Sequence, residues 1–181
     1  GSIVIEAKYI LEIVRKIDAD EIEFEMLDGS LTKISGNTAE FRINGMRASE
    51  YPAIDFSKPN ECFNVSEDIL KKIILQTSFA TSDKETRPVL TGVNFQCKEH
   101  QLHCVATDSY RLAKKTVEIE ESLNFNITIP AKSLQEVVKT LEGEGDVEIA
   151  VNDKKAQFII HDTIVQTRLI DGVYPETSRL I

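Results

Sequence analysis

The chain has 181 residues, of which 41% are hydrophobic and 28% are charged, and its formal net charge is −9. This balance is typical of a folded domain and excludes a disordered polar chain. The acidic total disfavours a simple basic nucleic-acid-binding domain but leaves binding through a local basic patch open. No segment approaches the ~20 consecutive apolar residues of a membrane-spanning helix, so no membrane partner is expected.

The first 55 residues predict a strand, a helix and then strands joined by tight turns. Ile3–Ile5 is short and apolar, and the helix Ala7–Ile17 follows it. Apolar residues recur in this helix at helical spacing, at Ile10, Leu11, Val14 and Ile17. Asp28-Gly29 is a turn signal between extended runs. The segment therefore predicts one strand–helix–strands unit.

The segment from about 60 to 118 shows the same order. Cys62–Val65 predicts a strand, and Ser66 is a favourable N-cap for a helix that has Glu67 and Asp68 in its first turn. Three alternating runs then predict strands, at Val89–Cys97, Leu102–Ala106 and Arg111–Val117.

The last segment repeats the first. Glu6-Ala7-Lys8 returns as Pro130-Ala131-Lys132, with an offset of 124 residues, and Tyr51-Pro52 returns as Tyr174-Pro175. The repeat predicts a strand, a helix and three further strands, at Ile127–Ile129, Ala131–Leu141, Val147–Val151, Ala156–Ile160 and Thr163–Ile170. We therefore predict an α+β protein built from repeated strand–helix–three-strand units with antiparallel sheets.

The repeats also predict the domain organisation. Residues 61–178 hold two units in series and predict one complete domain, whereas residues 1–55 hold a single unit and predict half a domain. Residues 56–60 are expected to form a connector, and residues 179–181 to begin a link to a further domain. The sequence is therefore expected to be part of a longer protein.

The three cysteines, Cys62, Cys97 and Cys104, match no zinc or redox spacing. Cys97 and Cys104 alternate with apolar residues in strand-like runs, where cysteine acts as a small hydrophobic residue. We therefore expect reduced, buried thiols, a cytoplasmic location, and neither a metal site nor a cofactor.

The sequence contains no nucleophile elbow, phosphate-binding loop or dinucleotide fingerprint. Gly143-Glu144-Gly145 predicts a helix C-cap and turn, because the acidic residues around it would repel phosphate. Thr107-Asp108-Ser109 places a hydroxyl beside a carboxylate, and its better interpretation is a turn in which Asp108 binds its own backbone. We expect no catalytic residue, although an enzyme with an unrecognised site remains an alternative.

Basic residues recur at matching places on the three predicted helices. They are Lys8 and Arg15 in the first helix, Lys71 and Lys72 in the second, Lys132 and Lys139 in the third, and Lys84 and Arg87 in the loop that follows the second. If the helices lie side by side, these bases form a positive stripe that meets phosphates loosely and without sequence readout. The alternative is a solvated face on which Glu12 and Glu136 pair with Lys8 and Lys132.

Three runs resemble the bacterial sliding-clamp family, the beta subunits of DNA polymerase III. They are Thr86-Arg87-Pro88-Val89-Leu90-Thr91-Gly92-Val93, Val105-Ala106-Thr107-Asp108-Ser109-Tyr110-Arg111-Leu112-Ala113 and Asp171-Gly172-Val173-Tyr174-Pro175. The resemblance implies a DNA-clamp fold with sheets outside and helices on one face, in a homodimeric ring around duplex DNA. It places residues 1–55 in the second half of the first clamp domain and residues 61–178 in the middle domain, with the eight bases on or near the DNA side.

The resemblance also implies a pocket for short linear peptides from the replicative polymerase subunit, the clamp loader and repair proteins. The part of its wall carried over by motif is Leu90, Thr107, Ser109, Tyr110, Arg111, Leu112, Pro175, Arg179 and Leu180. Its leucines and proline suit an apolar peptide side chain, and Arg111 and Arg179 suit polar or acidic groups.

The strand Ala39–Asn44 resembles the family's edge strand that meets the neighbouring subunit, with Phe41 and Ile43 as apolar contacts. The alternative is that both are core residues. The competing function is a β-rich protein-interaction module that binds peptides but not DNA.

Overall fold

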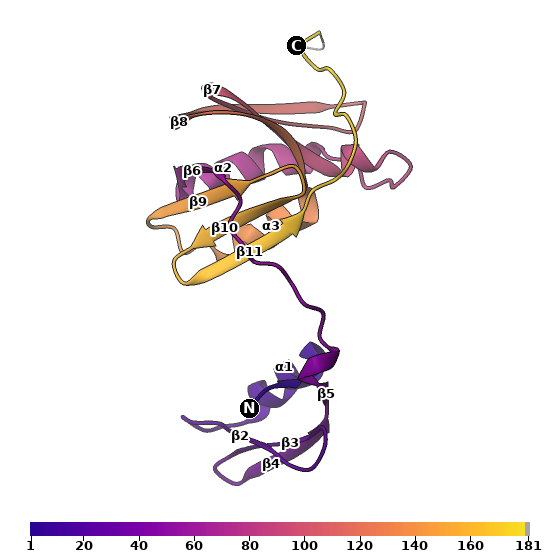
Figure 1. Cartoon of the computed structure of the whole chain (residues 1–181), viewed down its shortest axis with the longest axis vertical. Helices are drawn as coiled ribbons and strands as arrows, with labels where there is room; N and C mark the ends of the chain where they lie inside the picture. The colour runs from indigo at the N-terminus through magenta and orange to yellow at the C-terminus, as the bar shows by residue number, and fades with distance from the viewer. Residues whose placement is uncertain (180–181) are drawn as a thin grey trace. The chain divides into compact units, whose positions relative to one another are not determined.

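The computed structural model describes residues 1–179. They divide into two compact units, one ending at Asp55 and one beginning at Phe56. The first unit contains β1 (Ile3–Val4), α1 (Ala7–Lys16), β2 (Glu23–Met26), β3 (Leu31–Gly36), β4 (Ala39–Asn44), β5 (Met46–Arg47) and a 3₁₀ turn at Ala48–Glu50 (Figure 1).

The first unit is a small antiparallel sheet with one helix. Its strand order is β2-β3-β4, and β1 pairs separately with β5. The predicted turn at Asp28-Gly29 joins β2 to β3, and Gly29 adopts a φ of 65°, which suits glycine. The predicted amphipathic helix forms, but none of its residues is buried, and Leu11 remains 51% exposed. A three-stranded sheet offers too little surface to cover the whole apolar stripe.

Between Phe56 and residue 179, the second unit holds two antiparallel sheets and two α-helices. Its elements are β6 (Glu61–Ser66), α2 (Glu67–Thr77), 3₁₀ turns at Ser78–Ala80 and Pro88–Thr91, β7 (Gly92–Thr107), β8 (Leu112–Pro130), α3 (Ala131–Thr140), β9 (Asp146–Val151), β10 (Lys155–Ile160) and β11 (Thr163–Arg168). Ser66 caps α2 as predicted, because its hydroxyl accepts a hydrogen bond from the Ile69 amide at 3.2 Å.

The strands between α2 and α3 differ from the prediction. Val89 does not begin a strand, because Pro88–Thr91 forms a 3₁₀ turn and β7 starts at Gly92. Proline fixes φ and suits the first position of such a turn. The predicted separate strands merge into β7 and β8, whose pairing register shifts between Glu99 and Gln101. Glu99 has a φ of 57°, so the break predicted there appears as an irregularity within one long ribbon.

The two repeats of the second unit exchange their first strands. β6, which opens the first repeat, pairs with β9 in a sheet of order β11-β10-β9-β6. The end of β8, which opens the second repeat, pairs with the start of β7, with Gly92 opposite Pro130. Each repeat therefore completes the sheet of the other, and the two fold as one body.

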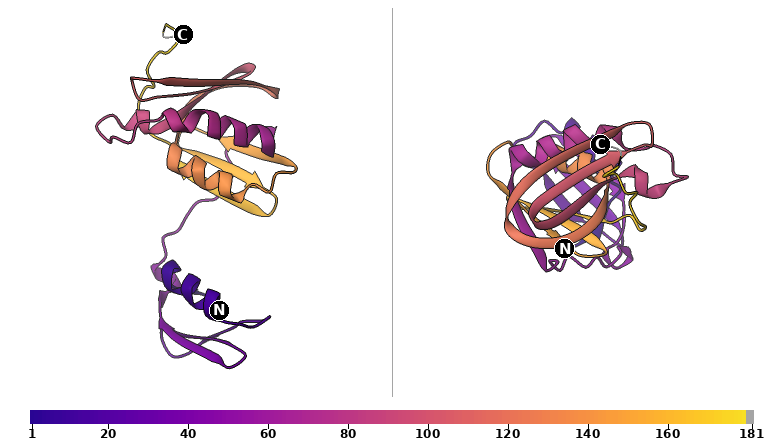
Figure 2. Two further views of the ribbon diagram at one scale, coloured as in Figure 1. Left: turned by 180° about the vertical axis from the view of Figure 1, so that it is seen from behind. Right: turned by 90° about the horizontal axis from the view of Figure 1, so that it is seen from above.

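Both helices of this unit lie side by side, between the β7–β8 ribbon and the sheet of β6 and β9–β11, as the view from behind shows (Figure 2). α2 buries Leu70, Ile73 and Ile74, and α3 buries Leu134 and Val137. These side chains pack against strand residues that include Phe63, Phe95 and Phe158. Burial of so many apolar side chains in one cluster is the main stabilising contribution.

The cysteines behave as predicted in the described part of the chain. Cys97 and Cys104 are buried and unbridged, and Cys62 is half-buried and unbridged. Burial raises the pKa of the Cys104 thiol well above its usual range. The thiols therefore serve as core side chains.

The predicted turn after α3 is held by a buried carboxylate. Gly143 and Gly145 have φ values of 98° and 105°. The side chain of Glu67, which is 1% exposed, accepts hydrogen bonds from the amides of Glu142 and Gly143. The start of α2 is thus tied directly to the end of α3.

The connector residues pack onto the second unit. Gln157, buried on β10, donates to the carbonyls of Phe56 at 2.9 Å and Ser57 at 3.2 Å. The Lys58 ammonium pairs with the Glu148 carboxylate on β9. None of the helices within residues 1–179 has the length and apolar character needed to cross a bilayer.

Candidate functional site

The loop from Thr107 to Leu112 is a rigid turn between β7 and β8. One carboxylate oxygen of Asp108 accepts from the amides of Tyr110 at 2.9 Å and Arg111 at 3.0 Å, and the other accepts from Arg111 Nε at 3.1 Å. The Thr107 hydroxyl donates to the Arg111 carbonyl at 2.6 Å. Asp108 thus binds its own backbone as predicted, and the turn presents Tyr110, which is 95% exposed.

A cavity of about 330 Å³ lies against this turn. Two arginines line it: Arg87 donates to the Ser109 hydroxyl at 3.1 Å, and the Arg111 guanidinium lies 5.7 Å from the centre of the Phe79 ring. Leu90 lines the cavity while remaining only 2% exposed. Leu90 and the Tyr110 ring supply apolar surface, and the three bases Lys84, Arg87 and Arg111 outnumber the two carboxylates Asp83 and Asp108 in the lining. This combination suits a peptide with apolar and acidic groups.

The structure brings together part of the predicted peptide wall. Leu90, Ser109, Tyr110 and Arg111 line this one cavity. Of the other predicted wall residues, Thr107 is buried in the turn, Leu112 and Pro175 are half-buried, Arg179 is exposed, and Leu180 lies outside the described residues. The cavity also takes in Lys84 and Arg87, which the resemblance placed near DNA.

Sequence reasoning missed several neighbours of the cavity. Asp83 and Thr86 line it, and Phe79 holds Arg111 without any motif to mark it. Tyr174 also lies against the start of the turn: burial raises the pKa of its hydroxyl to about 12, and the nearby Thr107 backbone opposes this rise. The repeated Tyr-Pro pair was the signal that could have identified Tyr174.

The pH dependence of the turn follows from Asp108. Hydrogen bonds from the amides of Tyr110 and Arg111, aided by the Arg111 charge, lower the pKa of Asp108. Because its folded-state pKa lies below the unfolded value of about 4, ionised Asp108 stabilises the turn above that pH, and this contribution is lost as the pH falls through the folded-state pKa. We expect the amide NMR shifts of Tyr110 and Arg111 to titrate together below about pH 4. In Asp108→Asn the two amide shifts should not change with pH in this range. A transition of the wild-type shifts above pH 4 would contradict the assignment to Asp108.

The predicted helix bases are exposed. Lys71, Lys72, Lys132 and Lys139 lie on the faces of α2 and α3 that the sheets do not cover. Lys72 pairs with Asp68 at 2.6 Å and Lys139 with Glu136 at 2.7 Å. The proposed pairing of Glu136 with Lys132 is therefore wrong, because its carboxylate reaches the base three residues later instead.

Two ammonium groups on this face remain available. Among the ion pairs within residues 1–179, none involves Lys71 or Lys132. In the first unit, Lys8 and Arg15 are exposed on α1. Exposed, unpaired cations on a helical face are suited to transient contact with phosphates.

The predicted subunit-interface residues lie on an edge strand. β4 is at one edge of the β2-β3-β4 sheet, and Phe41 and Ile43 are half-buried there. They stand opposite Ile34 and Thr32, both buried. Both side chains thus lie on the covered face of the sheet, while the backbone edge of β4 has no partner strand in the described part of the chain.

Comparison with known proteins identifies both units. Residues 1–55 match the family model of the DNA polymerase III beta subunit N-terminal domain, and residues 64–176 match its central domain. Beta sliding clamps from Bacillus subtilis and Halalkalibacterium halodurans are 40% and 42% identical over the whole chain. The chain spans about half the length of these relatives, 49% in each case.

Solved structures agree with the sequence comparison. A sliding clamp from Bacillus subtilis matches with a TM-score of 0.95 at 39% identity, covering 100% of this chain and 48% of that one. A beta chain from Streptococcus pneumoniae matches with a TM-score of 0.92 at 33% identity, covering 100% of this chain and 49% of that one. The resemblance and the α+β clamp fold predicted from the sequence are confirmed, and the chain belongs to the DNA polymerase III beta subunit family.

Proposed function

We propose that this chain is part of a sliding clamp that encircles duplex DNA without sequence specificity and tethers the replicative polymerase. The match of two clamp domains, in order and over residues 1–55 and 64–176, carries this proposal. The exposed bases of α2 and α3 support it, because weak phosphate attraction permits sliding. The net negative charge of the chain would repel DNA from its other surfaces, so contact would be limited to the basic helix faces.

In this proposal residues 1–55 form the second half of the first clamp domain, residues 61–178 form the middle domain, and 179–181 begin the link to a third. Lys8 and Arg15 would add to the DNA-facing bases from α1, and Lys84 and Arg87 from the loop after α2. The edge strand β4, with Phe41 and Ile43, would meet the neighbouring subunit of a homodimeric ring. The clamp would work in the cytoplasm and without catalysis, since enclosure requires no bond to be broken.

The cavity beside the Thr107–Leu112 turn would bind short linear peptides from the polymerase subunit, the clamp loader and repair proteins. Its two arginines and the apolar surface of Leu90 support this role. Thr107, Leu112, Pro175 and Arg179 would extend the wall around it, and Leu180 belongs to the same motif. A function as a peptide-binding module that never meets DNA shares this cavity, so only DNA experiments distinguish the two.

The decisive experiment uses a clamp of full family length that contains this sequence. After loading onto nicked circular DNA, it should remain bound during gel filtration and should leave once the circle is cut. Enclosure predicts this difference, because a ring can escape only from a free end. Failure of retention on closed circles would contradict the proposal and favour the interaction module.

Arg111→Ala is expected to weaken binding of a polymerase-derived peptide about tenfold, which corresponds to about 1.4 kcal/mol. The substitution removes a guanidinium from the cavity while Asp108 keeps its backbone bonds from two amides. Fluorescence anisotropy of a labelled peptide measures the change, with the exposed Lys98→Ala as the matched control. Equal affinity of Arg111→Ala and wild type would place the peptide elsewhere.

A further inference from the structure

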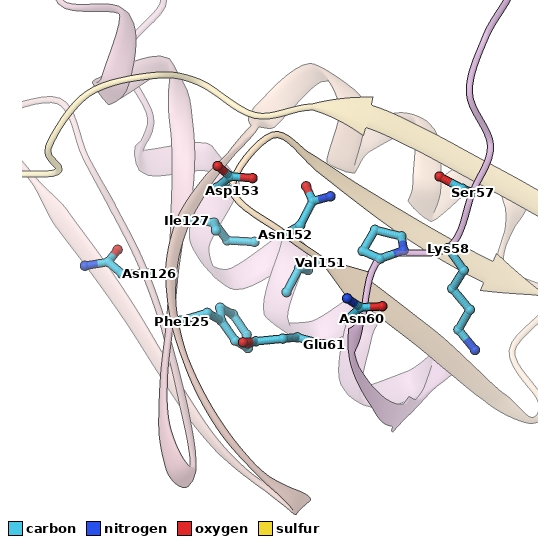
Figure 3. Close-up of a pocket in the computed structure, with 11 residues that line it drawn as sticks. Ser57, Lys58, Asn60, Glu61, Phe125, Asn126, Ile127, Val151, Asn152 and Asp153 are labelled. Atoms are coloured by element: carbon cyan, nitrogen blue, oxygen red, sulfur yellow. The ribbon is translucent and has the colours of Figure 1, made fainter.

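A second, larger pocket lies away from the peptide cavity and the basic helix faces. It has a volume of about 630 Å³ and shares no lining residue with the Arg87–Arg111 cavity. Three segments form it: the connector from Ser57 with the first residue of β6, Glu61; the β8 residues 125–127; and the end of β9 with the following turn, 151–153 (Figure 3). Its volume is within the usual range of ligand pockets.

The pocket is partly apolar and is held open by packing. Phe125 lines it and stacks on Phe63, with ring centres 5.7 Å apart and planes inclined by 22°. Pro59, Ile127 and Val151 complete the apolar wall. The connector side is fixed by the bonds of Gln157 to the carbonyls of Phe56 and Ser57. Such a site is largely formed before a ligand arrives, which lowers the entropic cost of binding.

One carboxylate in this wall lacks a partner. Glu61 Oε2 is buried and has no hydrogen-bond donor in the described part of the chain. Figure 3 shows the Glu61 carboxylate extending beside the Phe125 ring. A buried acceptor without a donor is costly, so a ligand that supplies one is favoured.

The charge of the pocket is negative. Lys58, the one basic residue among those that line it, is engaged by Glu148, whereas Asp153 adds a second carboxylate. Glu121 is a further carboxylate near Glu61. Burial raises the pKa of the Cys97 thiol, and the negative charges of Glu61 and Glu121 raise this pKa further, so both lie close to Cys97. The site therefore offers hydrogen-bond acceptors and negative charge around an apolar, aromatic wall.

We propose that this pocket binds an arginine or lysine side chain of a partner protein. The aliphatic stem would pack against Ile127 and Val151, and the cationic head would donate to Glu61. Arginine fits better than lysine, because a planar guanidinium stacks on an aromatic ring while it donates to a carboxylate. The site goes beyond the proposed function, as it lies apart from both the peptide cavity and the DNA-facing helices.

The test is an NMR titration of the 181-residue chain with N-acetyl-L-arginine amide. We expect saturable shifts of the backbone amides of Glu61, Phe125 and Asn152. N-acetyl-L-citrulline amide, which has nearly the same shape without the charge, should bind at least fivefold more weakly. Spermidine is titrated in a parallel experiment. If spermidine binds the pocket more tightly than the arginine amide does, the pocket is a site for a free polyamine, and the proposal of a protein partner is overturned.

Variants separate the pocket from general attraction to an acidic protein. Glu61→Gln should weaken the arginine amide at least fivefold. Glu120→Gln removes the same charge from an exposed position on β8 outside the pocket and should leave the affinity unchanged. Dispersed amide spectra confirm that both variants fold. Absence of saturable shifts, or equal weakening by the two variants, would overturn the proposal.

Discussion

Replacing Lys71 and Lys132 with glutamate in the full-length clamp should reduce the amount loaded onto nicked circular DNA about tenfold near physiological salt. These two bases are exposed on α2 and α3 and belong to no ion pair within residues 1–179. Each lost phosphate contact makes the negative slope of log affinity against log salt shallower by about 0.9. The glutamates also repel the phosphates. The loss should therefore grow as salt falls, where unscreened repulsion is strongest.

The matched control reverses Lys98 and Lys114, which are exposed on β7 and β8. This control changes the net charge by the same amount as the Lys71 and Lys132 reversals, but the changed residues lie on strands instead of helices. Loading should then remain near the wild-type level, and peptide affinity should be unchanged in both double variants. Equal loss in the two would show that total charge matters rather than the helical face. No loss in either would remove the support that the helix bases give to DNA binding.

Glu67→Ala should lower the free energy of unfolding of the second unit by about 3 kcal/mol. Glu67 is 1% exposed, and its Oε2 accepts from the amides of Glu142 and Gly143. Its Oε1 lies 2.9 Å from His161 Nε2, although the two atoms are not aligned as a hydrogen bond. Removing the carboxylate leaves two amides without their acceptor, while the bond of the Glu67 amide to the Gly145 carbonyl remains.

Urea unfolding followed by circular dichroism measures the change. Glu136→Ala removes an exposed carboxylate from α3 and should cost less than about 0.5 kcal/mol. Glu67→Gln keeps one carbonyl acceptor, so its loss of unfolding free energy should lie between those of Glu67→Ala and Glu136→Ala. A loss below about 1 kcal/mol for Glu67→Ala would mean that the turn after α3 holds without this anchor.

The features that sequence predicted well are local. The Ser66 cap involves an amide three residues away, and the Asp108 turn involves amides two and three residues away. Helical periodicity gave α1 and α3 to within a residue at each end, and the Ser66 cap gave the start of α2. Short-range hydrogen bonds and apolar spacing are properties of neighbouring residues, so the chain displays them before it folds.

The cavity beside the turn was only partly predictable. The motif around Thr107-Asp108 marked Ser109 and Arg111, but nothing in the sequence marked Phe79, which lies 5.7 Å from the Arg111 guanidinium across 32 positions of chain. Pro88 argued locally against a strand beginning at Val89. The strand was nevertheless predicted, because the alternation of apolar residues was given more weight. Contacts between distant segments depend on how the sheets and helices pack.

The amino-acid sequence by itself determined the repeated units, the positions of the helices, the reduced cysteines and the likeness to a clamp. Only the tertiary structure decided that the repeats exchange β6 and the end of β8, that Glu67 joins α2 to the turn after α3, and that Glu61 faces a pocket built from three segments. The physical reason is distance along the chain: register and long-range packing are set by mutual burial of apolar faces, and no single segment carries that information.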